Sequence, residues 1–171
     1  MFTSALVHFT SWLSGTGLTN TVASHFWIVP TLQTIHILSV AVVLIGVLLV
    51  NLRILGVAER SQPVGAVLDR FLTPVAVAIL VLAATGALQI AAEPTRALFR
   101  SIFWIKMGLI IAAAALTWSH RPAFAVADGG ATAAAPPARK AIALVALLLW
   151  LAVVVAGRWI AYTNAWPGAP E

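Results

Sequence analysis

Six polar side chains interrupt the long apolar stretches of this 171-residue chain: Gln33, His36, Gln89, Lys106, His120 and Arg158. Polar residues are costly inside a lipid bilayer, so each one found there is a candidate for function. His36 is the most informative of them, because a neutral imidazole can ligate a haem iron or carry a proton. The alternative is a histidine that only hydrogen-bonds a neighbouring helix.

The residues that could act with His36 lie near the same end of their apolar stretches. Gln33 is one helical turn before His36 on the same helix face. Lys106 and Arg158 each lie a few residues from one end of a later apolar stretch, the end expected on the outer side of the membrane. Both could point into a helix bundle on the outer side of His36. Two cations beside a histidine suit haem propionates, a quinone head group or an anionic solute. The alternative for Lys106 is that it extends to the lipid phosphates.

Depth in the membrane limits how a haem could be bound. His36 lies about 13 Å below the outer edge at 1.5 Å of rise per residue, and His120 lies about 20 Å deeper, so one haem cannot join them. Met107 is closer in depth and is a candidate second ligand, and two His36 side chains could instead meet across a homodimer. At the depth of His36 the other helices offer only poor ligands, namely Thr85, Gly86, Ile110 and Val153.

We therefore expect a site for haem b or quinone, in which His36 is the candidate axial ligand. The residues expected to bind the cofactor are His36, Gln33, Lys106, Arg158 and Gly86. His120 is a further candidate metal ligand, with an interfacial or helix-capping histidine as the alternative. No catalytic residue is expected, because the sequence has no glycine-rich phosphate loop and no nucleophile–base pair. An electron-transfer or accessory membrane subunit is favoured over a free-standing enzyme.

Composition excludes several classes of protein. The chain is 61% hydrophobic and only 9% charged, whereas a soluble domain has about a quarter of its residues charged. The absence of cysteine excludes disulfides, zinc–thiolate sites, iron–sulfur clusters and thiol catalysis. The net charge of +5 does not indicate nucleic acid, because the basic residues are scattered singly at the ends of apolar stretches. The expected surroundings are therefore a lipid bilayer.

Four apolar stretches must position these residues, and they cover residues 26–50, 71–92, 102–118 and 141–162. Each has close to the ~20 residues that cross a bilayer as a helix. Short connections predict an all-α, four-helix up-down bundle that forms a single membrane domain over residues 1–171. Pro30 and Pro74 are expected near the starts of the first and second helices, where a missing N–H costs little.

The remaining segments predict the topology. Apolar residues at helical spacing in residues 1–15 indicate an amphipathic helix in the membrane interface. Residues 123–138 are rich in alanine, glycine and proline and indicate a flexible cytoplasmic linker. Most loop cations follow the first and third helices, which places both termini outside by the positive-inside rule. These cations are Arg53, Arg60, Arg70, Arg121, Arg139 and Lys140, against Arg96 and Arg100 in the opposite loop.

Several short segments resemble a bacterial family of small four-helix inner-membrane proteins whose function is unknown. The resemblance covers nearly the whole chain and rests on His36–Leu38, Gly46, Asn51–Gly56, Ala92–Pro94, Phe103–Gly108, His120 and Gly157–Ile160. The chain departs from that family at Gln33 and Asn51, where acidic residues would be expected. The layout is similar, more distantly, to b-type cytochrome membrane subunits and to copper-resistance D-type proteins. These resemblances imply redox or metal-linked work at the histidines.

Three functions remain in competition at this level. The first is a redox module that passes electrons between a periplasmic or membrane partner and the quinone pool. The second is a non-enzymatic accessory subunit of a membrane complex or a small permease, favoured by the scarcity of ligands. Copper handling is the third, and two methionines without any cysteine argue against a soft copper site.

Overall fold

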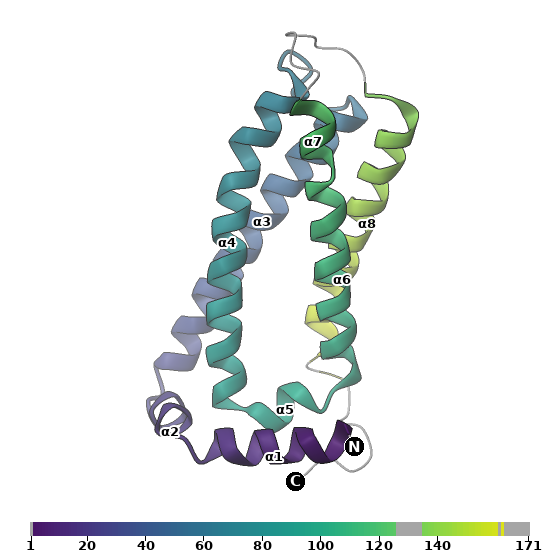
Figure 1. The fold of residues 1–171 in the computed structure, drawn as a ribbon. Helices are drawn as coiled ribbons and strands as arrows, with labels where there is room; N and C mark the ends of the chain where they lie inside the picture. Colours follow the sequence, from purple (N-terminus) through teal and green to yellow (C-terminus); the bar gives the residue numbers. More distant parts are fainter. Residues whose placement is uncertain (1, 126–134, 161, 163–171) are drawn as a thin grey trace.

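The computed structural model describes residues 2–125, 135–160 and 162, and all secondary structure in these residues is helical (Figure 1). Four helices are long: α3 (Ile28–Leu55), α4 (Val64–Ala92), α6 (Ser101–Trp118) and α8 (Pro137–Trp159). Four are short: α1 (Phe2–Ser14), α2 (Gly17–Ser24), α5 (Pro94–Leu98) and α7 (His120–Ala125). The long helices, with α7 extending α6, are long and apolar enough to cross a membrane. The predicted all-α class and the four long apolar helices are thus confirmed.

Successive long helices run in opposite directions (Figure 1). Helix α3 packs against both α4 and α8, and α6 packs against α8. Helices α1, α2 and α5 gather at one end of the bundle, called the α1 end, and α7 lies at the other, called the α7 end (Figure 1). This arrangement brings the N-terminal halves of α3 and α6 and the C-terminal halves of α4 and α8 together at the α1 end.

The apolar core occupies the middle of the bundle and its α7 end. A middle cluster draws on all four long helices, and its buried members are Val43, Val47, Val75, Ala78, Ala113, Trp150 and Val153. A second cluster at the α7 end contains Val50, Ile54, Val64, Val67, Leu68, Leu72, Ala135 and Ala143. Inside the middle of the bundle, the Trp150 indole N–H donates to Thr117 Oγ1 at 3.1 Å. The polar site described below therefore stands beside a packed core, on its α1 side.

Helices α3 and α4 approach closely because α3 has a glycine, Gly46, at the contact. A Cβ atom on Gly46 would collide with Cγ2 of the buried Val75. Small residues at such positions let helix backbones pack tightly where lipid removes the hydrophobic drive for association. This contact fixes the register of α3 against α4 and so the depth at which their polar residues meet.

Three helices extend beyond the predicted stretches toward the α7 end, and one of them is α8, which begins at Pro137 instead of residue 141. Helix α3 continues to Leu55 and ends at Gly56, which takes the left-handed conformation (φ +79°) that suits glycine at a helix C-terminus. Helix α4 begins at Val64, so the expectation that Pro74 lies near its start is wrong, and Pro74 is inside the helix. Asp69 and Arg70 reduce the hydropathy of this extension without breaking the helix.

The other segments also differ in detail. The predicted N-terminal helix is α1, with Leu6 and Thr10 buried and Phe9 and Trp12 exposed, and a further helix α2 follows it. The predicted linker over 123–138 is partly helical, since its first residues belong to α7 and its last two to α8. Its residues 126–134 lie outside the described part of the chain.

Candidate functional site

His36 is held by a hydrogen bond from α3 to α4. Its Nδ1 lies 2.8 Å from Thr85 Oγ1, and the Thr85 hydroxyl donates in turn to the Val81 carbonyl at 2.8 Å. Because that hydroxyl has a single proton, we assign the proton between the two side chains to His36 Nδ1. No hydrogen bond reaches Nε2 from the residues that the structure describes. Nε2 therefore keeps a lone pair for a ligand or a proton.

Helix α4 contributes two further groups to the surroundings of His36. A Cβ on Gly86 would lie 3.6 Å from His36 Cε1, so this residue stands directly beside the imidazole. One turn after Thr85, the buried Nε2 of Gln89 has no hydrogen-bond partner among the described residues. An amide donor without a partner is thus present on the helix that anchors His36.

Lys106 brings a positive charge to the same region from α6. Its side chain crosses to α8, where a Cβ on Gly157 would lie 3.6 Å from Lys106 Nζ and 3.7 Å from Cε. Lys106 is near the start of α6 and His36 is in the first third of α3, so both lie in the α1 half of the bundle. Within residues 2–125, 135–160 and 162, the two ion pairs are Glu93–Arg96 and Asp69–Arg121, so no described carboxylate pairs with this half-buried cation.

Other predicted site residues stand apart from this group. Gln33 is exposed on α3. Arg158 is also exposed, and its Nη2 donates to the Tyr162 hydroxyl at 2.9 Å with the guanidinium 5.2 Å from the ring centroid. Met107 is half-buried beside Lys106 in sequence, and His120 lies at the α7 end. Of the residues expected from the sequence, the structure places Gly86 beside His36 and puts Lys106 in the same half of the bundle.

Thr85 is the residue that sequence reasoning underrated. Its depth matches that of His36, but a threonine is a poor metal ligand, so a search for ligands passes over it. Its actual role is to fix the imidazole through a hydrogen bond. The useful signal was therefore the match in depth rather than the type of side chain.

The α1 end of the bundle is covered by short helices. Leu6 of α1 packs with Leu98 and Phe99 of the α5 segment. Thr19 of α2 donates through Oγ1 to the carbonyl of Ala91 near the end of α4, at 2.9 Å. Helices α1, α2 and α5 thus form a cap, which we call the α1-end cap.

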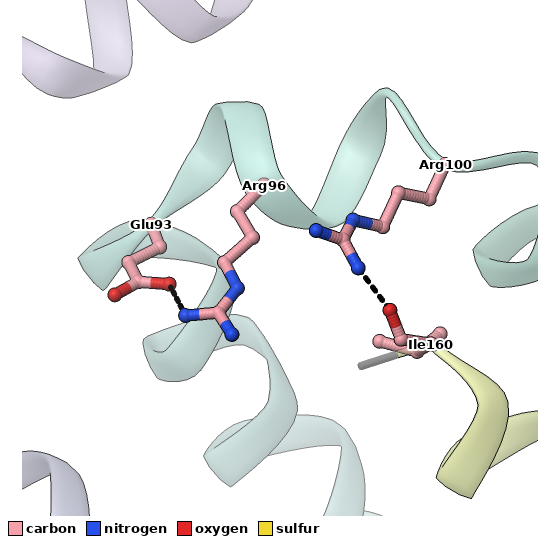
Figure 2. A network of polar contacts seen from close by, with 4 residues as sticks. All are labelled: Glu93, Arg96, Arg100 and Ile160. Carbon is pink, nitrogen blue, oxygen red and sulfur yellow. Dashed lines mark hydrogen bonds and ion pairs between the residues drawn. The ribbon is translucent and has the colours of Figure 1, made fainter. Parts of the chain in front are cut away.

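Charged residues of α5 and the following turn complete this cap (Figure 2). Arg100 donates through Nη1 to the carbonyl of Ile160, which joins the turn before α6 to the end of α8. Arg96 and Glu93 form an exposed ion pair at 2.9 Å. The Arg100 contact holds the start of α6 and the end of α8 together at the α1 end of the bundle.

The site therefore offers one lone pair, one cation and one amide donor to a ligand. No group of three or more histidine, cysteine or acidic residues that could hold a bare metal ion is found in the described residues. A haem could use His36 alone, because the Nδ1–H bond to Thr85 orients the ring as in metal-bound histidines. A quinone head group could use all three groups, since its oxygens accept from cations and amides and its quinol form donates to Nε2.

Comparison with known proteins places the chain in a family. The sequence model of DUF6644, a family of unknown function, matches residues 9–163, so the chain belongs to this family. No curated protein and no solved structure matches the chain.

Proposed function

We propose that this DUF6644 protein is a membrane redox module that binds a quinone head group beside His36. The observation that carries the proposal is the imidazole of His36, which Thr85 holds through Nδ1 so that Nε2 keeps its lone pair. The half-buried Lys106 ammonium lies in the same half of the bundle. The cation and the Gln89 amide suit the oxygens of the oxidised quinone, and Nε2 suits the hydroxyl of the quinol. All three groups occur within a bundle whose outward surface is apolar.

The chemistry of such a site is proton-coupled electron transfer. A quinol that becomes a quinone gives up two electrons and two protons. Nε2 can accept one of these protons, because Nδ1 already carries its own and is held by Thr85. The second proton leaves to solvent and the electrons pass to a redox partner in or beside the membrane. Lys106 stabilises negative charge that develops on the quinone oxygens.

Haem b is a second candidate for the same site. The specific observation in its favour is that the Thr85 bond leaves Nε2 as the ligating nitrogen of His36. Lys106 would then pair with a haem propionate. The two cofactors are distinguished by the absorption spectrum, because haem has a Soret band and quinone does not.

The same proposal includes insertion in a bacterial inner membrane as a multi-pass protein. The long helices expose large apolar side chains such as Ile37, Leu80, Ile111 and Leu148, as lipid-facing helices do. Because loop cations are concentrated at the α7 end, we place this end in the cytoplasm and both termini outside. A green fluorescent protein fused to the C-terminus should be dark, and a fluorescent fusion would reverse the orientation.

The test of the site uses protein purified in lipid nanodiscs from haem-replete cells. Its absorption spectrum is recorded first, and the quinone extracted from it is then quantified per protein chain. We expect bound quinone, which His36→Ala removes and Lys106→Gln reduces. His25→Ala and Lys140→Gln are matched controls, because His25 bonds its own segment near Thr21 and Lys140 lies near the start of α8 at the opposite end.

Three outcomes contradict parts of this proposal. A Soret band that His36→Ala abolishes would replace quinone by haem b. Quinone content that is equal in His36→Ala and wild type would remove the site from His36. A protein without quinone or chromophore that co-purifies with a stable partner would favour an accessory subunit instead.

A further inference from the structure

A second group of unsatisfied polar atoms lies at the α7 end of the bundle. Asn51 and His120 have no exposed surface. Three of their atoms have no hydrogen-bond partner within the described residues: both ring nitrogens of His120 and the Oδ1 atom of Asn51. Native proteins pair the great majority of such buried atoms, with protein groups or with water. Three unpaired atoms on two enclosed side chains therefore indicate that something binds there.

Two independent contacts bring Asn51 and His120 to a common depth. Asn51 follows Val47 of the middle cluster by one turn, and Nδ2 donates to the Val47 carbonyl at 2.7 Å. Thr117 accepts a hydrogen bond from Trp150, which belongs to the same cluster. His120 comes three residues after Thr117. Because α3 and α6 run in the same direction, both residues lie about 5 Å beyond that cluster by helix rise.

The aromatic ring next to His120 leads to the same place. The His120 and Phe124 rings have centroids 6.3 Å apart. Phe124 packs against the α7-end cluster, which contains Val50 and Ile54 on either side of Asn51 in sequence. Asn51 and His120 thus border one cluster from two helices.

This group is separate from the His36 site. The middle cluster, made of side chains such as Val43, Ala78, Ala113 and Val153, lies between the two depths. The described residues of that cluster offer apolar surface and the Trp150–Thr117 hydrogen bond. A ligand at the α7 end is therefore bound independently of the proposed quinone.

The chemistry of the three atoms selects the ligand. A neutral imidazole has one donor and one acceptor nitrogen, and Asn51 Oδ1 is an acceptor. A cation is disfavoured, because the Arg139 guanidinium donates to the carbonyl of Ser119 beside His120. An anion is disfavoured by Oδ1, whose lone pairs it would meet. A small neutral group that both donates and accepts is required, and buried water typically makes about three such bonds.

We propose that Asn51 and His120 bind an internal water molecule at the α7 end of the bundle. The water donates to Asn51 Oδ1 and to the unprotonated nitrogen of His120. The protonated nitrogen faces the other side of the ring and donates to a second water. The Asn51 amide is oriented for this by its Nδ2 bond to Val47. The site is a hydrated imidazole enclosed within the helices.

Solid-state NMR of ¹⁵N-histidine protein in lipid bilayers tests the site directly. Magnetisation is transferred from water protons to the imidazoles, and the His120 signal is assigned from its loss in His120→Leu. We expect transfer to His120, at least halved in Asn51→Leu. The exposed His25 provides the positive control in the same spectrum. Transfer to His25 without transfer to His120 would overturn the proposal.

A double-mutant cycle of Asn51→Leu and His120→Leu tests whether the two residues share the ligand. Each single variant should lower the folding equilibrium constant several-fold, because it leaves the other side chain unpaired. The double variant should lose less than the product of the two single losses. Independent losses that multiply would show that no ligand is shared. A gain in stability in either single variant would show a dry site and would equally reject the water.

Discussion

Replacing Gly46 by alanine perturbs the closest contact between α3 and α4. The new Cβ would collide with Val75 Cγ2 and lie 3.5 Å from the Phe71 carbonyl oxygen. Val75 is fully buried and branched at Cβ, so its side chain has few other rotamers. The helices must therefore move apart, and overpacking of this kind costs about 1–3 kcal/mol.

A matched variant separates this cost from helix propensity. Alanine in place of glycine inside a helix stabilises by roughly 0.5–1 kcal/mol. A Cβ on Gly108 of α6 would meet nothing within 4 Å, so Gly108→Ala should show that gain alone. The difference between Gly46→Ala and Gly108→Ala then isolates the collision, and we expect about 1–3 kcal/mol in the free energy of unfolding.

The assay is reversible unfolding in mixed micelles with increasing sodium dodecyl sulfate, followed by tryptophan fluorescence. Val75→Ala supplies a rescue, because it removes the methyl group that the new Cβ meets. The cost of Gly46→Ala should be smaller in the Val75→Ala background than in the wild type. Equal stability of Gly46→Ala and Gly108→Ala, or an undiminished cost with Val75→Ala, would refute the contact.

Three further predictions concern single hydrogen bonds. Thr85→Val removes the acceptor of His36 Nδ1, and we expect roughly a two- to tenfold loss of quinone affinity by titration. An unchanged affinity would contradict the positioning role of Thr85. Trp150→Phe removes the bond to Thr117 and should lower the free energy of unfolding by about 1 kcal/mol in the same micelle assay, whereas no loss would count against it. Arg100→Gln breaks the link to the carbonyl of Ile160 just after α8, so amide exchange in the last turn of α8 should accelerate, and unchanged exchange would show that the link is dispensable.

Apolar length was sufficient to predict the four long helices, because a run of about 20 apolar residues has few alternatives to a helix. Their ends could not be predicted as well. Asp69 and Arg70 lower the hydropathy before the predicted start of α4, yet both are compatible with a helix that continues to Val64. Hydropathy records which residues suit lipid, whereas the helix ends where capping geometry such as that of Gly56 stops it.

The sequence predicts the depth of the site residues along the helices, but not which of their side chains face the inside of the bundle. The rise per residue predicts His36, Gly86 and Lys106 at one end of the bundle, and in the structure all three lie in its α1 half. The same reasoning included Gln33 and Arg158, which the structure leaves exposed. A helix surrounded by lipid and apolar neighbours is apolar on every face, so its sequence contains little information about its rotation. Only packing decides which polar side chains turn inward.

The α1-end cap has a consequence for how a ligand reaches His36. A solute from the aqueous phase would have to pass α1 and α5, whose contact at Leu6, Leu98 and Phe99 is apolar. A lipid-soluble molecule could instead diffuse sideways between the long helices, without crossing the cap. In the proposed membrane setting, this arrangement would sort ligands by their solubility before any side chain recognises them. In that setting, the cap would admit compounds already dissolved in the bilayer and keep polar metabolites away from the imidazole.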